Sequence, residues 1–128
     1  MSTTRKPVVT DKAPRPIGPY SQAIAEGDFI FCAGQGPGNP ATGKLELGDV
    51  AAQTTRTLEN MRAILEAAGS SLDKVVKCNV YLGNIADFAA MNEVYGRFFS
   101  APYPARTTIQ AGALPGGIAV EIECIARK

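Results

Sequence analysis

A strict alternation of side-chain character near the C-terminal end constrains the fold more than any other feature of this chain. Apolar or small residues occupy every second position there, at Ile118, Val120, Ile122, Cys124 and Ala126. Glu121 and Glu123 lie between them. A period of two predicts a β-strand with one buried face, from whose other face both carboxylates project.

A second alternating stretch comes just before this strand. Arg106, Thr108 and Gln110 alternate with smaller or apolar residues, and residues 112–117, rich in Gly and Pro, separate the two stretches. Breakers between two strand patterns predict a hairpin. In a hairpin folded about its middle, Arg106 lies opposite Glu123 and Thr108 opposite Glu121. A guanidinium, a hydroxyl and two carboxylates then share one face.

Two interpretations of this polar face remain open on the pattern alone. The face is either a solvated surface with cross-strand ion pairs, or a small-molecule site. In a site, an Arg fork binds a carboxylate bidentately and a Glu positions or deprotonates a water. The alternation by itself favours the solvated surface.

Length and charge exclude several classes of protein. The 128 residues fit one domain, 1–128, whose first five or so residues are expected to be disordered. A net charge of +1 argues against a nucleic-acid or membrane binder driven by electrostatics. The N-terminus has no apolar segment typical of a secretory signal, and no apolar stretch is long enough to span a bilayer. A cytoplasmic protein is expected.

The cysteine and histidine content narrows the chemistry. Cys32, Cys78 and Cys124 are odd in number and far apart, which predicts three buried thiols rather than a disulfide or zinc site. The chain has no histidine, the commonest general base and metal ligand. Any chemistry must therefore use carboxylates, phenols, hydroxyls, arginine or backbone groups, without a metal.

The order of the elements predicts an α+β fold, with two helices packed on one face of a mainly antiparallel sheet. The strand at 28–34 is almost entirely apolar, which is typical of a strand covered on both faces and suggests burial by other subunits. Before the C-terminal strand pair, strands are expected at 7–10, 21–26, 28–34 and 75–82, and helices at 49–69 and about 87–99.

Several motifs resemble those of the Rid family, also called YjgF/UK114. They are Ile17-Gly-Pro-Tyr-Ser-Gln22, Phe31-Cys-Ala-Gly-Gln35, Asp87-Phe-Ala-Ala-Met-Asn92 with Tyr95, and Pro104-Ala-Arg106 followed by Leu114-Pro115 and Val120-Glu-Ile-Glu-Cys-Ile-Ala126. The resemblance extends over about residues 10–127. It implies a chorismate-mutase-like fold and a homotrimer, in which the sheets form a central barrel and sites lie between neighbouring subunits.

The resemblance also implies an activity. Rid proteins with this Arg look like deaminases that hydrolyse 2-iminopropanoate and 2-iminobutanoate to 2-keto acids and ammonia, with no cofactor. Arg106 would bind the substrate carboxylate, and Glu121 would position the water. The other substrate-binding residues that the resemblance implies are Tyr20, Gly34, Asn92 and Thr108.

Two departures from the bacterial pattern bear on substrate preference. Ala33 stands where bacterial members often carry Ser, and Thr108 stands where they often carry Cys. Three alternatives stay open. One is a non-catalytic or regulatory binder of small carboxylates, which needs Arg106 but not Glu121. Another is a deaminase of larger imine acids of the aminomuconate type. The third is an RNA-acting protein, for which a basic surface would be expected.

Overall fold

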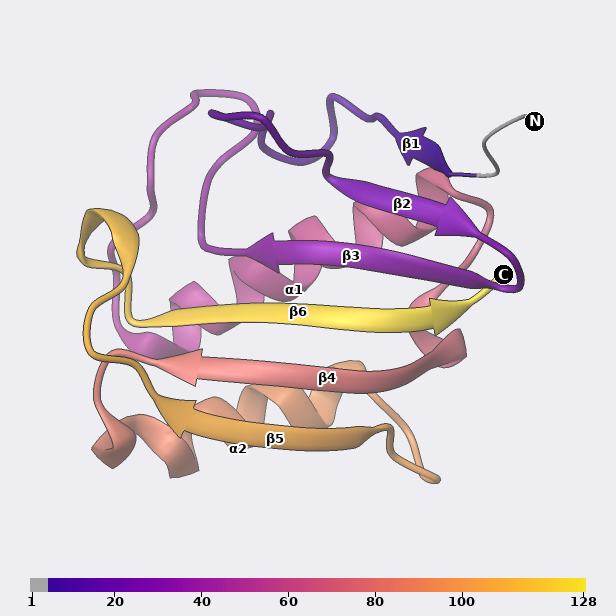
Figure 1. Ribbon diagram of the computed structural model, residues 1–128. Coiled ribbons are helices and arrows are strands. Elements are labelled where there is room, and N and C mark those ends of the chain that lie inside the picture. The colour runs from indigo at the N-terminus through magenta and orange to yellow at the C-terminus, as the bar shows by residue number, and fades with distance from the viewer. Residues whose placement is uncertain (1–4) are drawn as a thin grey trace.

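The computed structural model describes residues 5–128, so the expected disorder of the first residues lies mostly outside the described part. Within it, the elements follow the predicted order (Figure 1). The strands are β1 (Lys6–Val8), β2 (Ala23–Glu26), β3 (Phe29–Gln35), β4 (Val75–Leu82), β5 (Ala105–Gln110) and β6 (Val120–Arg127). The helices are α1 (Val50–Ala67) and α2 (Phe88–Phe98), with short 3₁₀ turns at Leu72–Lys74, Ile85–Asp87 and Pro115–Gly117.

The strands of residues 5–128 form one six-stranded sheet in the order β1-β2-β3-β6-β4-β5. Every neighbouring pair is antiparallel except β4 and β5, which are parallel. Both helices lie behind the sheet in Figure 1 and leave its other face uncovered by this chain. The α+β class with a mainly antiparallel sheet is therefore confirmed, and the parallel pair of β4 and β5 makes the sheet mixed.

The predicted C-terminal hairpin is wrong. β4 lies between β5 and β6, so Arg106 is opposite Cys78 of β4, whereas Glu123 is opposite Asn79 and Glu121 is opposite Tyr81. The chain runs from β4 through α2 into β5, and a helical crossover places the next strand parallel to the first. The residues after β5 then carry the chain to the gap between β3 and β4. Alternation identified which residues of one strand share a face, but not which strands are neighbours.

The boundaries of α1 agree with the sequence. The Asp49 side chain accepts a hydrogen bond from the Ala52 N–H at 2.8 Å, as expected of an N-cap, and Gly69 follows the helix with φ of 79°. The first strand ends at Val8 rather than at the expected Thr10. The reason is that the Thr10 N–H donates to the Gln22 side chain at 2.8 Å instead of to a strand.

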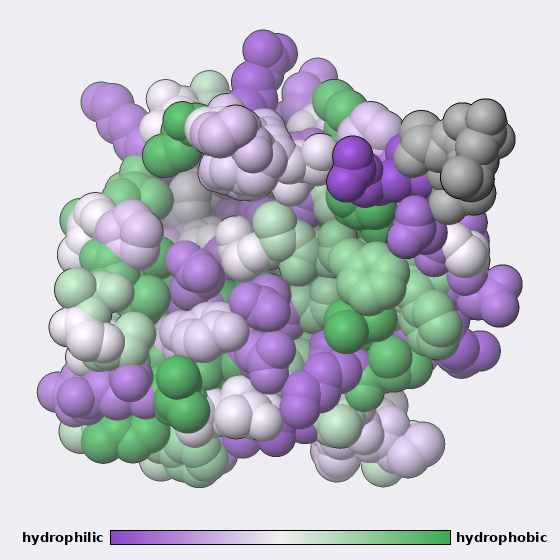
Figure 2. Space-filling view, viewed as in Figure 1, coloured by the Kyte–Doolittle hydropathy of each residue, from purple (hydrophilic) through white to green (hydrophobic). Residues whose placement is uncertain are grey.

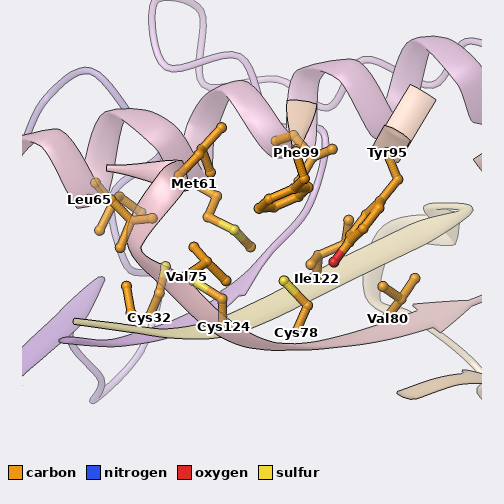
Figure 3. Close-up of a cluster of buried hydrophobic side chains, with 14 of the residues drawn as sticks. Cys32, Met61, Leu65, Val75, Cys78, Val80, Tyr95, Phe99, Ile122 and Cys124 are labelled. Carbon is orange, nitrogen blue, oxygen red and sulfur yellow. The ribbon is translucent and has the colours of Figure 1, made fainter. Parts of the chain in front are cut away.

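The core lies between the sheet and the helices, and contains all three thiols (Figure 3). Cys32, Cys124 and Cys78 are opposite one another across β3, β6 and β4. All three are free and buried, which confirms the sequence interpretation. Burial is the main reason that the pKa of Cys78 rises to about 11, so this thiol stays neutral.

The uncovered face of the sheet carries both apolar and charged side chains (Figure 2). Phe29 and Phe31 are 39% and 44% exposed, so one chain does not cover this face of β3, and the expected burial by other subunits stays a prediction. Apolar side chains gather on the right of Figure 2, next to a hydrophilic band. Within residues 5–128, no helix is both long and apolar enough to cross a membrane.

Candidate functional site

Arg106 lies on the edge strand β5, and its side chain is on the face covered by the helices. Its opposite residue, Cys78, is buried on that face. The guanidinium carbon of Arg106 is 4.7 Å from the centroid of the Tyr95 ring and 5.6 Å from that of Phe88, both on α2. No carboxylate of residues 5–128 forms an ion pair with it. The chain thus holds a cation against two aromatic rings at the edge of its sheet.

An open pocket of about 510 Å³ adjoins this guanidinium, between α2 and the segment that leads into β5. The pocket is lined by Asn92, Tyr95, Gly96, Tyr103, Pro104 and Arg106. Asn92 and Arg106, two of the predicted substrate-binding residues, are therefore brought together. The aromatic and proline walls make the pocket largely apolar around one fixed positive charge.

Two polar atoms in this region, Asn92 Oδ1 and Thr108 Oγ1, are buried and have no hydrogen-bond partner in the part of the chain that the structure describes. Thr108 is two residues after Arg106 on β5, so its side chain projects from the same face. Buried polar groups are normally paired in folded proteins. These two atoms are available to a polar ligand. The Tyr95 hydroxyl instead points into the core (Figure 3), where it interacts with the Cys78 thiol.

The outer edge of β5 adds backbone donors. Ala111 donates its N–H to the Leu82 carbonyl at 2.8 Å, so alternate residues of β5 direct their backbone groups toward β4. The N–H groups of Arg106 and Thr108 belong to the other set and face away from β4. A carboxylate at this edge can accept hydrogen bonds from the guanidinium and from the backbone.

Glu121 lies on the opposite, uncovered face of the sheet. A Cβ placed on Gly34 of β3 would be only 2.5 Å from Glu121 Oε2, so glycine leaves the room that the carboxylate needs. Burial, and secondarily the charge of Glu123, raises the pKa of Glu121 above its usual value. Within residues 5–128, no hydrogen bond or ion pair satisfies this carboxylate.

Glu123 is already engaged by its neighbours. Its two carboxylate oxygens accept hydrogen bonds from Asn79 Nδ2 at 3.3 Å and from the Tyr81 hydroxyl at 3.2 Å. Glu121 is therefore the acid on this face whose charge is free to act on another molecule.

The expectation that Arg106 and Glu121 share one face is wrong within a single chain. One set of predicted residues, Arg106 with Asn92 and Thr108, lies on the helix-covered side, and the other, Glu121 with Gly34, on the uncovered side. The reason is the intervening β4, which replaces the cross-strand pairing of a hairpin. Tyr20 joins neither set through its hydrogen bonds, which are local: its hydroxyl accepts from the Ile17 N–H, and its own N–H donates to the Gly18 carbonyl.

The family model described as Endoribonuclease L-PSP matches residues 10–128. The chain belongs to the Rid (YjgF/UK114) family. It is 53% identical over 121 residues to a RutC family protein of Pyrococcus abyssi, covering 94% of this chain and 95% of the relative. It is 46% identical over 125 residues to the 2-iminobutanoate/2-iminopropanoate deaminase of Bos taurus, covering 98% and 91%.

A solved structure gives the same fold. The crystal structure of TdcF from E. coli with bound serine superposes with a TM-score of 0.90 at 39% identity, covering 96% of this chain and 98% of that one. The Rid family and its fold are thus confirmed for this chain, whereas the association of three copies and the role of each residue stay predictions.

Sequence reasoning missed the buried amides that anchor the loops of this Rid chain. Gln22 accepts from the Thr10 N–H and donates to the carbonyls of Thr10, Ala13 and Pro14, which fixes the loop that carries Tyr20. Asn60 of α1 similarly donates to the carbonyls of Gly36 and Gly38. The sequence signal that could have found them is a single amide side chain in apolar surroundings: Gln22 directly precedes a strand, and Asn60 lies on the apolar stripe of a helix.

Metal-binding geometry is not found in the part of the chain that the structure describes. No group of three or more Cys, Asp or Glu side chains there could hold an ion.

Proposed function

We propose that this Rid protein hydrolyses small 2-imino acids, such as 2-iminopropanoate and 2-iminobutanoate, to 2-keto acids and ammonia. The observation that carries the proposal is the Arg106 guanidinium, which has no acid partner in residues 5–128 and lies beside a pocket and a strand edge. The relative from Bos taurus is named a deaminase of these imines, whereas the name of the Pyrococcus abyssi relative states no activity. TdcF was crystallised with serine, which carries a similar carboxylate.

Arg106 binds the substrate carboxylate in this proposal. Its planar fork accommodates two carboxylate oxygens at once, and the outward N–H groups of Arg106 and Thr108 orient the same anion. The aromatic walls of the pocket leave room for a short aliphatic side chain. Asn92 Oδ1, buried and unpaired within the described chain, accepts a hydrogen bond from the imine nitrogen.

The acid comes from another copy of the chain. Because Glu121 projects from the opposite face to Arg106, one chain cannot apply both groups to one substrate. In the homotrimer that we propose, Arg106 of one subunit meets Glu121 of the partner subunit in a shared cleft. The exposed Phe29 and Phe31 on the uncovered face support such an association, because it removes them from water.

The reaction then needs only water and proton transfers. The substrate reacts as the protonated imine, and Glu121 accepts a proton from water as the oxygen bonds to the imine carbon, which leaves a hydroxyl and a neutral amine on that carbon. Glu121 transfers this proton to the amine. It then takes the hydroxyl proton as the C–N bond breaks with its electron pair on nitrogen, and passes that proton to the departing ammonia, so that a 2-keto acid and ammonium are released. In the single chain, burial raises the pKa of Glu121 above its usual value, which favours this carboxylate as a base.

An amino-acid oxidase that generates 2-iminobutanoate in situ provides the test, with semicarbazide trapping the imine that escapes hydrolysis. We expect Arg106→Ala to abolish the acceleration and Arg106→Lys to retain a small part of it, because Lys keeps the charge without the fork. Arg62→Ala is the matched control, since its guanidinium lies 5.5 Å from the Phe98 ring, away from the pocket. Wild-type rates in Arg106→Ala would refute the carboxylate-binding role.

A further inference from the structure

We infer that Tyr95 and Phe88 are positioning residues, whose aromatic rings restrain the Arg106 guanidinium. In many proteins a carboxylate that forms an ion pair with the arginine does this instead. The inference rests on the proposed function, because it assigns the rings a purpose in binding the substrate carboxylate. The two residues are seven apart on α2, which is about two helical turns, and therefore lie on the same face of the helix.

The contact geometry fits a cation held between a helix and a strand. The guanidinium carbon is 4.7 Å from the Tyr95 ring centroid and 5.6 Å from that of Phe88, inside the range of cation–π attraction. A ring takes none of the five N–H donors into a conventional hydrogen bond, and no oxygen atom of residues 5–128 accepts a hydrogen bond from them. The donors remain available to a carboxylate in the pocket.

The arginines on the helices of this chain each approach an acid, including Arg62, which also lies 5.5 Å from the centroid of the Phe98 ring. Arg97 pairs with Glu93 at 2.8 Å, and Arg56 and Arg62 both approach Glu59. An acid beside Arg106 would occupy the same fork that a ligand carboxylate needs. Two rings restrict the side chain without competing with the ligand for its hydrogen bonds.

Tyr95 is rigid enough for this task. Its side chain is 5% exposed, and its ring stacks on Phe99 with 4.6 Å between centroids. Burial raises the pKa of Tyr95 above its ordinary value, so the phenol stays neutral and forms no ion pair with Arg106. Its contribution to Arg106 is therefore the ring, and phenylalanine should replace it.

The experiment compares full-length wild type with Tyr95→Leu, Tyr95→Phe and Phe88→Leu. One readout is the ¹⁵N relaxation of the Arg106 Nε–Hε group in the free protein, assigned with Arg106→Lys. The other is the KM and kcat for 2-iminobutanoate. We expect Tyr95→Leu to mobilise the Arg106 group and to raise KM about tenfold with kcat within twofold. Tyr95→Phe should restore both, and Phe88→Leu should show a weaker form of the same effect.

Phe99→Leu is the matched control, because it removes the ring that stacks on Tyr95 without touching Arg106. It should lower the melting temperature but leave KM and the Arg106 relaxation unchanged. The inference is overturned if Arg106 stays as ordered in Tyr95→Leu as in wild type, or if Phe99→Leu raises KM as much. If Tyr95→Leu fails to fold, Phe88→Leu tests the inference by the same two readouts. Phe88 is 39% exposed, so its replacement should disturb the fold less. Absence of turnover in wild type refutes the proposed function instead, and the relaxation readout still tests the rings.

Discussion

Arg106 and Glu121 are each placed without an opposite charge among residues 5–128, one against aromatic rings and the other against a glycine. Proteins seldom bury part of a charge without pairing it, because desolvation is costly. Both groups are therefore poised to interact with something outside their own chain. The two charges have opposite signs, as a substrate with an anionic end and an electrophilic end requires.

Removing the Glu121 charge should separate binding from chemistry. Glu121→Gln keeps the shape of the side chain but cannot accept a proton from water. We expect its kcat for 2-iminobutanoate to fall by about 10² to 10⁴ while 2-oxobutanoate still binds, as measured by calorimetry. Glu123→Gln is the control, since Asn79 and Tyr81 already engage that carboxylate. Equal rates in Glu121→Gln and wild type would favour a non-catalytic carboxylate binder.

The raised pKa of Glu121 also predicts how stability depends on pH. A carboxyl group whose pKa rises on folding stabilises the fold while it is protonated, and that contribution is lost as pH rises through the folded-state pKa. Glu121→Gln should therefore melt higher than wild type at pH 8, and by a smaller margin at pH 4. Thermal unfolding at matched concentration measures this. A margin that is the same at both pH values would contradict burial of the carboxylate as the source of the shift.

At the scale of elements, the sequence predicted what each stretch forms but not which strands pair. The apolar alternation of β6 and the apolar stripe of α2 are strong sequence signals, because both elements contribute side chains to the hydrophobic core. β5 gives a weak signal, because Arg106 and Thr108 project toward the helices but are polar, whereas core-facing residues of a strand are usually apolar. Its place outside β4 depends on the crossover through α2, and local alternation cannot report that.

Loop anchoring supplies a prediction at the same scale. Gln22 is buried and makes four hydrogen bonds to the backbone of residues 10–14, so Gln22→Ala should lower the free energy of unfolding by about 2 kcal/mol. Faster hydrogen exchange in residues 10–20 should accompany the loss. Gln110→Ala is the comparison, because exposed Gln110 accepts one bond, from the Ile85 N–H. Equal stability of the two variants would show that the loop does not depend on Gln22.

At the scale of the whole molecule, the sheet face opposite the helices carries both apolar and charged side chains and is not covered by this chain. Phe31 is 44% exposed there, so Phe31→Lys should convert the proposed homotrimer, three times the 13.4 kDa chain, into smaller species. Light scattering after gel filtration measures the mass. Ile85→Lys alters an apolar residue that is 48% exposed outside the sheet, and should leave the mass unchanged. A wild-type monomer would remove the shared cleft from the proposed function.

The motifs of the sequence led to the correct family because they carry both sets of polar residues in a fixed order. They did not reveal that the two sets are on opposite sides of one sheet, because that separation follows from β4 lying between β5 and β6. For the same reason the pattern alone could not say whether Arg106 and Glu121 belong to one subunit or to two.

The outer edge of β5 has a consequence for what an anion does when it binds. An edge strand with outward amides is a template on which another strand can pair and start aggregation. A carboxylate bound to the amides of Arg106 and Thr108 acts as a one-residue cap in place of that strand. A bound substrate would then also prevent another strand from pairing alongside β5, for as long as the pocket stays occupied.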